Sequence, residues 1–298
     1  MEGALKPQGG STRPQGVAAP DPQRLSLNTA TTKERWGLAQ AIEGCARHGI
    51  RGISPWRDQL QAMGVAQAAA AIRAHGLTVT GLCRGGLFPA ATAALRAAAI
   101  ADNLRAVEEA HAIGAQCLVL VVGGLPEGSR DLAGAREQVR EGIAAVLPAA
   151  RAAGVPLAIE PLHPMYAADR ACVNTLAQAL DLCEALDPQG VQGPVALGVA
   201  VDVYHVWWDP QLEAQIARAG RRVLAHHICD WRVQTRDLLT DRGMMGDGVI
   251  DLPRIRGWVR ATGYAGFDEV EIFSALDWWT RDPDEVLAVC KERHQRCC

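Results

Sequence analysis

The sequence lacks a long apolar run, an apolar N-terminal segment and an excess of positive charge. Its longest unbroken apolar run, near Cys117–Val122, is far too short to cross a bilayer, and the chain does not begin with the apolar stretch of a secretory signal. The 298 residues carry 30 Lys and Arg against 33 Asp and Glu, a formal net charge of −3, whereas proteins that bind the phosphate backbone usually present a basic face. We therefore expect neither a membrane protein nor a nucleic-acid-binding protein.

The nine cysteines form no CxxC pair, which leaves a zinc ribbon without support. Several of them lie inside apolar segments, where a thiol behaves as a small hydrophobic group. This usage is typical of the reducing cytoplasm, which is where we expect the protein to reside. The final pair, Cys297 and Cys298, is predicted to be an exposed tail.

Residues 1–23 are rich in Gly, Pro and Gln and have no hydrophobic periodicity, which predicts a disordered leader before a single domain over residues 24–298. From Arg24 onward one pattern recurs. An Ala-rich amphipathic stretch ends at a glycine, and a short apolar run of strand length follows. The glycines that end these stretches are Gly49, Gly76, Gly114, Gly154, Gly190, Gly220 and Gly263.

These glycines are spaced by roughly 30 to 40 residues, the length that one strand and one helix need with their loops. Together with an opening strand at Arg24–Asn28, the apolar runs give eight strands that alternate with helices. The pattern predicts an α/β fold, a single (β/α)8 TIM barrel. A doubly wound open sheet is the alternative, but the GxGxxG turn that would favour it after an early strand is absent.

Ionisable residues gather at the carboxyl ends of the last four predicted strands, where TIM barrels carry their sites. A lone charge embedded in apolar sequence is costly to bury unless it is paired or bound to a metal. A single Glu or His there is more often a salt-bridged or hydrogen-bonded structural residue, but four successive strands with suitable ligands favour a metal site. These residues are Glu160 and His163, Asp202 and His205, His226, His227 and Asp230, and Glu269 and Glu271.

Three carboxylates and one imidazole form a mostly oxygen ligand set, which suits Mn²⁺ or Mg²⁺ and also accepts Co²⁺ or Zn²⁺. The alternation of side chains along a strand narrows the choice of ligands. Glu269 and Glu271 share one face, and Glu271, nearer to the mouth, is the better ligand. His226 and His227 face opposite sides, so only one of them can enter the site.

These residues resemble the xylose isomerase-like TIM barrel superfamily, in particular its sugar phosphate isomerase/epimerase family, and the resemblance extends from about Arg24 to about Val289. In that family one divalent ion, often manganese, is held by Glu, Asp, His and Glu. The matching motifs are the strand-end Glu160, the DxxH of Asp202 and His205, His227 in HICD, the GDG of Gly246–Gly248, and Glu271 in EIF. The resemblance implies Glu160, Asp202, His227 and Glu271 as the metal ligands.

The resemblance also implies that the two glutamates serve as the acid–base pair and that His205 contacts the substrate. Relatives often use an Arg beyond the ligand His to hold substrate oxygens, and Arg232 lies near that position. His163 follows Glu160 in a segment where many relatives have Asn, and is a further candidate for substrate contact.

Such enzymes move a proton on a carbon next to a carbonyl, through an enediolate that a divalent ion stabilises. Glu160 and Glu271 would take and return that proton. Trp56, Arg84 and Trp231 follow predicted strands and could contact the substrate, because Trp stacks on sugars and Arg binds carboxylate or phosphate groups. Barrel capping, an interface between subunits and surface salt bridges are the structural alternatives for these three.

The implied activity is that of a metal-dependent sugar or sugar phosphate isomerase or epimerase with a small sugar or polyol substrate. The resemblance also implies a homodimer or a homotetramer. One alternative is a metal-dependent lyase that dehydrates a keto-inositol or a related polyol. Another is a non-catalytic sugar-binding barrel, which would need no complete ligand set. An endonuclease-like phosphodiesterase would need more histidines at the mouth and a more basic chain.

Overall fold

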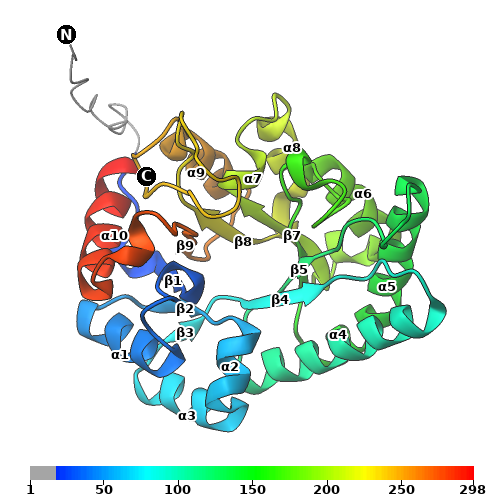
Figure 1. Cartoon of the computed structure of the whole chain (residues 1–298), viewed down its shortest axis with the longest axis horizontal. Coiled ribbons are helices and arrows are strands. Elements are labelled where there is room, and N and C mark those ends of the chain that lie inside the picture. Colours follow the sequence, from blue (N-terminus) through cyan, green and yellow to red (C-terminus); the bar gives the residue numbers. More distant parts are fainter. Residues whose placement is uncertain (1–17) are drawn as a thin grey trace.

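The computed structural model describes residues 18–298, which form a closed parallel barrel inside a ring of helices (Figure 1). The predicted TIM barrel is confirmed. All neighbouring strands are parallel, in the order β3-β2-β1-β9-β8-β7-β6-β5-β4. The strands are β1 Leu25–Asn28, β2 Gly52–Ser54, β3 Thr78–Val79, β4 Leu82–Gly86, β5 Leu118–Val121, β6 Leu157–Ile159, β7 Leu197–Asp202, β8 Val223–Ile228 and β9 Asp268–Val270.

The nine strands occupy eight positions around the barrel, which we call staves. The third stave is split into β3 and β4. Strand β3 pairs with β2, and β4 pairs with β5. Between the two pieces the backbone changes partners: Thr80 N donates to Ile53 O at 2.9 Å, whereas Leu82 N donates to Cys117 O at 3.0 Å. A parallel bridge between Trp56 and Cys83 then joins the end of the second stave to β4 and closes the barrel.

Helices follow most strands and cover the outside of the barrel (Figure 1). Left-handed glycines end several of them as predicted: Gly49 follows the first helix with φ 66° and Gly154 follows the fifth with φ 67°, a conformation that residues with a Cβ rarely adopt. The helices are α1 Leu38–His48, α2 Arg57–Met63, α3 Val65–Ala74, α4 Ala93–Ile113, α5 Leu132–Ala153, α6 Leu176–Leu186, α7 Val203–Val206, α8 Leu212–Ala219, α9 Leu252–Ala261 and α10 Pro283–Cys297.

Two hydrophobic layers hold the barrel. The larger one packs strands against helices, and the smaller one brings together residues of the strands themselves: Cys83, Cys117, Val119, Ala158, Ala200 and Ala225. Most of these residues are small, and they lie on or beside β4 to β8, whereas the other strands carry buried polar side chains. Ser26, Asn28, Ser54 and Thr80 are such side chains in the first three staves.

Most of the leader predicted over residues 1–23 lies outside the described residues. In the described part, Gln295 of α10 donates a hydrogen bond to Pro20 O at 3.0 Å. The prediction that Cys297 and Cys298 are exposed is wrong, since both are buried where α10 packs against the rest of the fold. All nine cysteines, each within residues 18–298, are buried and free.

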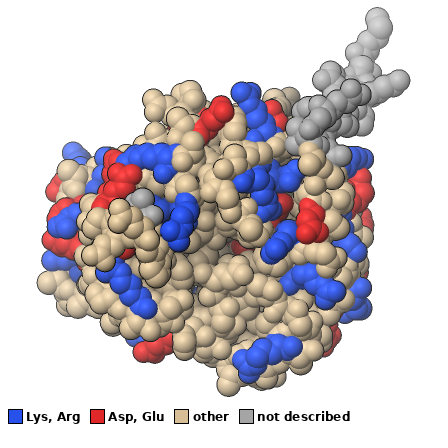
Figure 2. Space-filling view, turned by 180° about the vertical axis from the view of Figure 1, so that it is seen from behind, with Lys and Arg blue, Asp and Glu red and all other residues tan. Residues whose placement is uncertain are grey.

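Within residues 18–298, every helix is too short or too polar to span a membrane. On the face of the molecule shown in Figure 2, lysine and arginine side chains are scattered, with acidic side chains among them, and the surface is hollowed near its centre.

Asn103 of α4 holds the end of β4 in place. Its Oδ1 accepts from Gly86 N at 2.6 Å and its Nδ2 donates to Gly86 O at 2.7 Å, so one buried amide satisfies both main-chain groups of a residue beside a register shift in the β4–β5 ladder.

We predict that Asn103→Ala lowers the free energy of unfolding by about 2 kcal/mol or more, because two buried main-chain groups lose their partner. Chemical denaturation measures the change. Glu108→Ala, an exposed substitution on the same helix, is the control and should change stability by less than about 0.5 kcal/mol. Equal denaturation midpoints for the two variants would contradict this role of Asn103.

Candidate metal centre

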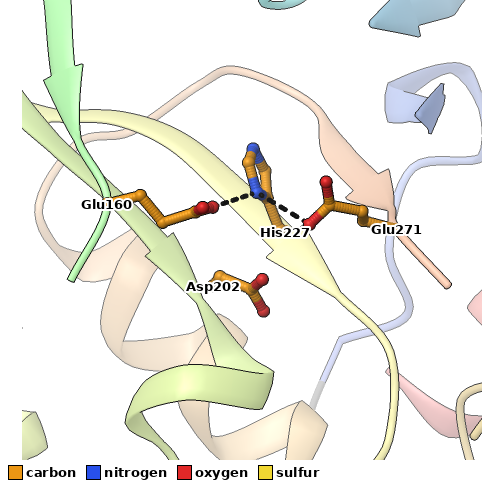
Figure 3. Close-up of side chains that lie close together, drawn as sticks. All are labelled: Glu160, Asp202, His227 and Glu271. Carbon is orange, nitrogen blue, oxygen red and sulfur yellow. Dashed lines mark ion pairs between the residues drawn. The ribbon is translucent and has the colours of Figure 1, made fainter. Parts of the chain in front are cut away.

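Four side chains from neighbouring strands meet at the carboxyl end of the barrel (Figure 3). Glu160 directly follows β6, Asp202 ends β7, His227 lies near the end of β8, and Glu271 directly follows β9. The ladder aligns them, because Asp202 pairs with His227 and His227 pairs with Glu269. Parallel strands with this register bring the four side chains to one level of the barrel.

The ligand atoms of the four residues are close enough to share one ion. One atom from each lies within 4.8 Å of the others, and all four residues are buried. His227 Nδ1 lies 2.9 Å from Glu160 Oε1 and 3.7 Å from Glu271 Oε2, on the two sides drawn in Figure 3.

The hydrogen bonds of this cluster are incomplete. Among the described residues, buried Glu160 Oε1 and both ring nitrogens of His227 have no hydrogen-bond partner, although Nδ1 and Oε1 are only 2.9 Å apart. Buried polar atoms are rarely left unsatisfied. Three carboxylates and an imidazole are also a suitable donor set for a divalent ion such as Mn²⁺, Mg²⁺, Co²⁺ or Zn²⁺. The residues present therefore fit one bound divalent cation.

Arg242 adds a fixed positive charge to the cluster. Its Nη1 donates to Asp202 Oδ2 at 3.0 Å and to Glu271 Oε2 at 3.2 Å, and its Nη2 lies 3.2 Å from His205 Nε2. The guanidinium also stacks over Tyr204 and Phe273, with Cζ 4.5 Å and 5.0 Å from the ring centroids. Two carboxylates are thus held in place from the side by one buried guanidinium.

The charges of the cluster shift the pKa values of its members in opposite directions. Burial would raise the pKa of Asp202, but Arg242, with help from His205 and His227, outweighs burial and lowers this pKa to about 2. Burial raises the pKa of Glu271 to about 8, and the nearby carboxylate of Glu160 adds to the rise, against the opposing effect of Arg242. The uncharged form of Glu271 is therefore favoured, whereas Asp202 stays ionised beside Arg242.

Glu269 supports His227 from the far side of the ring. Its Oε1 lies 3.4 Å from His227 Nε2. The carboxylate is held by Asn28 Nδ2 at 2.8 Å and by Thr80 Oγ1 at 2.7 Å. A carboxylate behind a metal-ligating imidazole commonly fixes its orientation and raises its basicity. His226 points to the other side of β8, as predicted, and contacts Asp268 Oδ1 at 2.9 Å.

A cavity of about 550 Å³ opens onto this cluster. Glu160 and Glu271 line it, whereas Asp202 and His227 are not among its lining residues. The other lining residues are Lys33, Trp56, Cys83, Arg84, Leu87, Val119, Val121, Leu162, Tyr166, Asp169, Arg170, His205, Leu239, Thr240, Arg242, Phe273 and Trp279.

The structure separates the residues proposed from sequence to contact substrate into two groups. Trp56, Arg84 and His205 line the cavity. His163 and Trp231 do not; their rings stack at 5.2 Å between centroids, and the main-chain N–H of His163 donates to His205 Nδ1 at 3.2 Å.

Arg232 also lies away from the cavity lining. It forms an ion pair with Asp277 at 2.7 Å and lies 3.5 Å from Asp247, so its charge is neutralised within the fold. Arg242, ten positions further along the chain, reaches the site instead. The one local signal for Arg242 is weak: it directly precedes the GMMGDG turn.

The sequence from residue 42 to residue 291 matches the model of the xylose isomerase-like TIM barrel family. The chain belongs to this family. The match covers β2 to β9 and therefore all four residues of the cluster.

Individual relatives agree with this assignment. Inosose isomerase of Bacillus velezensis is 25% identical over 282 residues, which cover 90% of this chain and 95% of the relative. The crystal structure of protein SMc04130 from Sinorhizobium meliloti 1021 is 62% identical, with a TM-score of 0.90 over 93% of this chain and 99% of that one. The crystal structure of the IOLI protein with a binding zinc atom has the same fold, at 21% identity and a TM-score of 0.76, over 91% of this chain and 96% of that one.

We predict that Mn²⁺ at a hundredfold excess over its Kd raises the melting temperature of the protein by roughly 5 °C, since binding to the folded state alone stabilises it. Asp202→Asn should abolish the shift and the metal retained after dialysis, because it removes one charged ligand. Asp58→Asn, an exposed substitution in α2, should leave both unchanged. Retention of Mn²⁺ by Asp202→Asn at the wild-type level would contradict the site.

We predict further that Glu269→Gln weakens Mn²⁺ binding about 10- to 100-fold without removing a ligand, because the amide supports the His227 imidazole less well than a carboxylate does. Titration of the metal-free protein by calorimetry measures the Kd. The exposed Glu108→Gln serves as the control. If Glu269→Gln binds Mn²⁺ with the wild-type Kd, Glu269 does not support the ligand.

Proposed function

We propose that this protein is a metal-dependent isomerase or epimerase of sugars or polyols, in which Glu160 and Glu271 transfer the proton. One observation carries the proposal. Of the four clustered residues, the two glutamates line the cavity, whereas Asp202 and His227 lie behind them. This arrangement suits two residues that meet substrate and two that act as ligands alone.

Glu160 and Glu271 lie on two sides of His227 Nδ1, so a substrate carbon above the cluster would have a carboxylate on each side. One carboxylate can take a proton from a carbon beside a carbonyl, and the other can return it. A divalent cation, when bound by the four residues, would stabilise the negative charge that develops on the substrate oxygens.

Other residues of the cavity support this role. Arg242 holds Glu271 and Asp202 in position, and its stacking on Tyr204 and Phe273 keeps the guanidinium from moving. Trp56, Phe273 and Trp279 offer apolar surface of the kind that packs against the C–H faces of sugars. The relative named inosose isomerase makes cyclic keto-polyols a suitable first class of substrate to test.

We predict that Glu160→Gln and Glu271→Gln each slow proton exchange at the carbon next to the carbonyl by about 100- to 10,000-fold, the usual contribution of a general acid or base. NMR of inosose and of free ketohexoses in D₂O, with Mn²⁺-loaded protein, measures the exchange and also shows whether water is lost, as it would be in a dehydratase. Metal content is measured in the same samples.

Glu43→Gln, an exposed substitution on α1, is the matched control and should exchange at the wild-type rate. Near-wild-type exchange in both active-site variants, with the metal retained, would contradict the proposed proton transfer. Loss of water from the substrate would favour the lyase alternative.

A further inference from the structure

A row of three aromatic rings on the cavity wall has a cation at each end. Trp56 and Phe273 pack edge to face with centroids 5.6 Å apart, and Phe273 packs against Trp279 at 5.8 Å. Arg84 Cζ lies 5.9 Å from the Trp56 ring, and Lys33 Nζ lies 4.6 Å from the Trp279 ring. All five residues line the cavity that leads to the metal centre.

Neither cation forms an ion pair within residues 18–298. Arg84 and Lys33 also form no side-chain hydrogen bond with the described residues, and each lies near an aromatic ring instead. Arg57, which follows Trp56 in the chain, shows the contrast: it pairs with Asp102 at 2.8 Å and with Glu109 at 2.6 Å. Burial lowers the pKa of Arg84, against the opposing effect of the Glu160 carboxylate, and the charge of Arg170 adds to the lowering.

The charge balance inside the cavity shows where an anion is missing. At the centre, a divalent cation and Arg242 would offset most of the negative charge of Glu160, Asp202, Glu269 and Glu271. Beyond the centre, Arg84, Lys33 and Arg170 face the cavity with Asp169 as the remaining lining carboxylate. Asp169 lies 3.9 Å from Arg170, at the limit of an ion pair. The outer cavity therefore keeps a net positive charge.

A neutral polyol gives no reason for this arrangement. Hydroxyl groups are bound equally well by neutral donors, whereas a partly buried guanidinium without a counter-charge is costly. Arg84 presents several N–H donors in one plane, which match two oxygens of a carboxylate or phosphoryl group. The Trp56 ring, with its centroid 5.9 Å from Cζ, lies beside the guanidinium and favours its charge.

We propose that the substrate carries an anionic oxygen group, a carboxylate or a phosphoryl group, bound by Arg84 and attracted by Lys33 and Arg170. This inference rests on the proposed function, which places the reacting end of the substrate at the metal centre. The anionic end would then lie in the outer cavity.

Calorimetry with the Mn²⁺-loaded full chain tests the proposal. The probes are sorbitol, gluconate and the phosphate monoester of sorbitol, which share a carbon skeleton and differ in charge. At least one anion should bind about 10- to 100-fold more tightly than sorbitol, the usual gain from a charge-assisted hydrogen bond. Gluconate and the phosphate ester distinguish the two kinds of anionic group. Added salt should weaken binding of the anion and leave sorbitol unaffected.

Arg84→Gln should remove most of the preference for the anion, and Arg73→Gln, an exposed substitution in α3 with the same charge change, should keep it. Lys33→Gln, an exposed substitution, should remove a smaller part of the preference for the anion. This variant provides the test if Arg84→Gln does not fold. The titration is repeated on metal-free protein, because gluconate could also bind through its carboxylate to the metal. Binding by Arg84 needs no ion, so the preference for the anion should persist there.

Equal affinity for all three probes, or an unchanged preference in Arg84→Gln, would overturn the proposal. These binding measurements need no turnover. If the protein prefers the anion but exchanges no proton on any substrate, the proposed function fails and this inference remains. If it exchanges protons on neutral substrates and binds all three probes equally, this inference fails and the proposed function remains.

Discussion

The crowding of negative charge around one buried imidazole governs the chemistry of this protein. Glu160, Glu269 and Glu271 all approach His227, and Asp202 lies opposite it in the ladder. Such a group of carboxylates is unfavourable in a protein interior unless cations balance it. Arg242 supplies one charge from the side, but burial and the carboxylate of Glu160 still raise the pKa of Glu271. A divalent ion is the compensation that this geometry allows.

The barrel makes the crowding possible. Parallel strands bring four side chains to one level without a loop having to fold inward, and the small residues Ala158, Ala200 and Ala225 keep the space beside them open. Beneath the centre, Asn28 from the neighbouring strand β1 and Thr80 from the third stave hold Glu269. The ligands are therefore positioned by the sheet and by hydrogen bonds within it, which is the rigid support that a metal centre requires.

Much of this could be predicted from the sequence, because strand ends are local features. The recurring glycines and apolar runs gave the barrel, and alternation along β8 separated His226 from His227. Contributions from loops were harder to find. Arg242 is fifteen residues beyond His227 and reaches the centre only because its loop folds back, while Arg232, nearer in sequence, is paired with Asp277.

Packing against distant elements was also invisible in the sequence. Cys297 and Cys298 end the chain, and nothing local indicates that α10 covers them. The row of Trp56, Phe273 and Trp279 likewise joins segments more than two hundred residues apart. Each such contact depends on closure of the barrel, which the order of strands implies but which no single motif specifies.

The split third stave lies in a part of the chain that contributes to the cavity and not to the cluster of four. The four clustered residues lie at the ends of β6 to β9, while Lys33, Trp56 and Arg84 come from the first ninety residues, on either side of the point where β3 gives way to β4. Under the two proposals, the late stretch would supply the reacting groups, and the early stretch would supply part of the contact with the substrate. A descendant could acquire a different substrate by changing the early stretch while inheriting its chemistry intact from the late one.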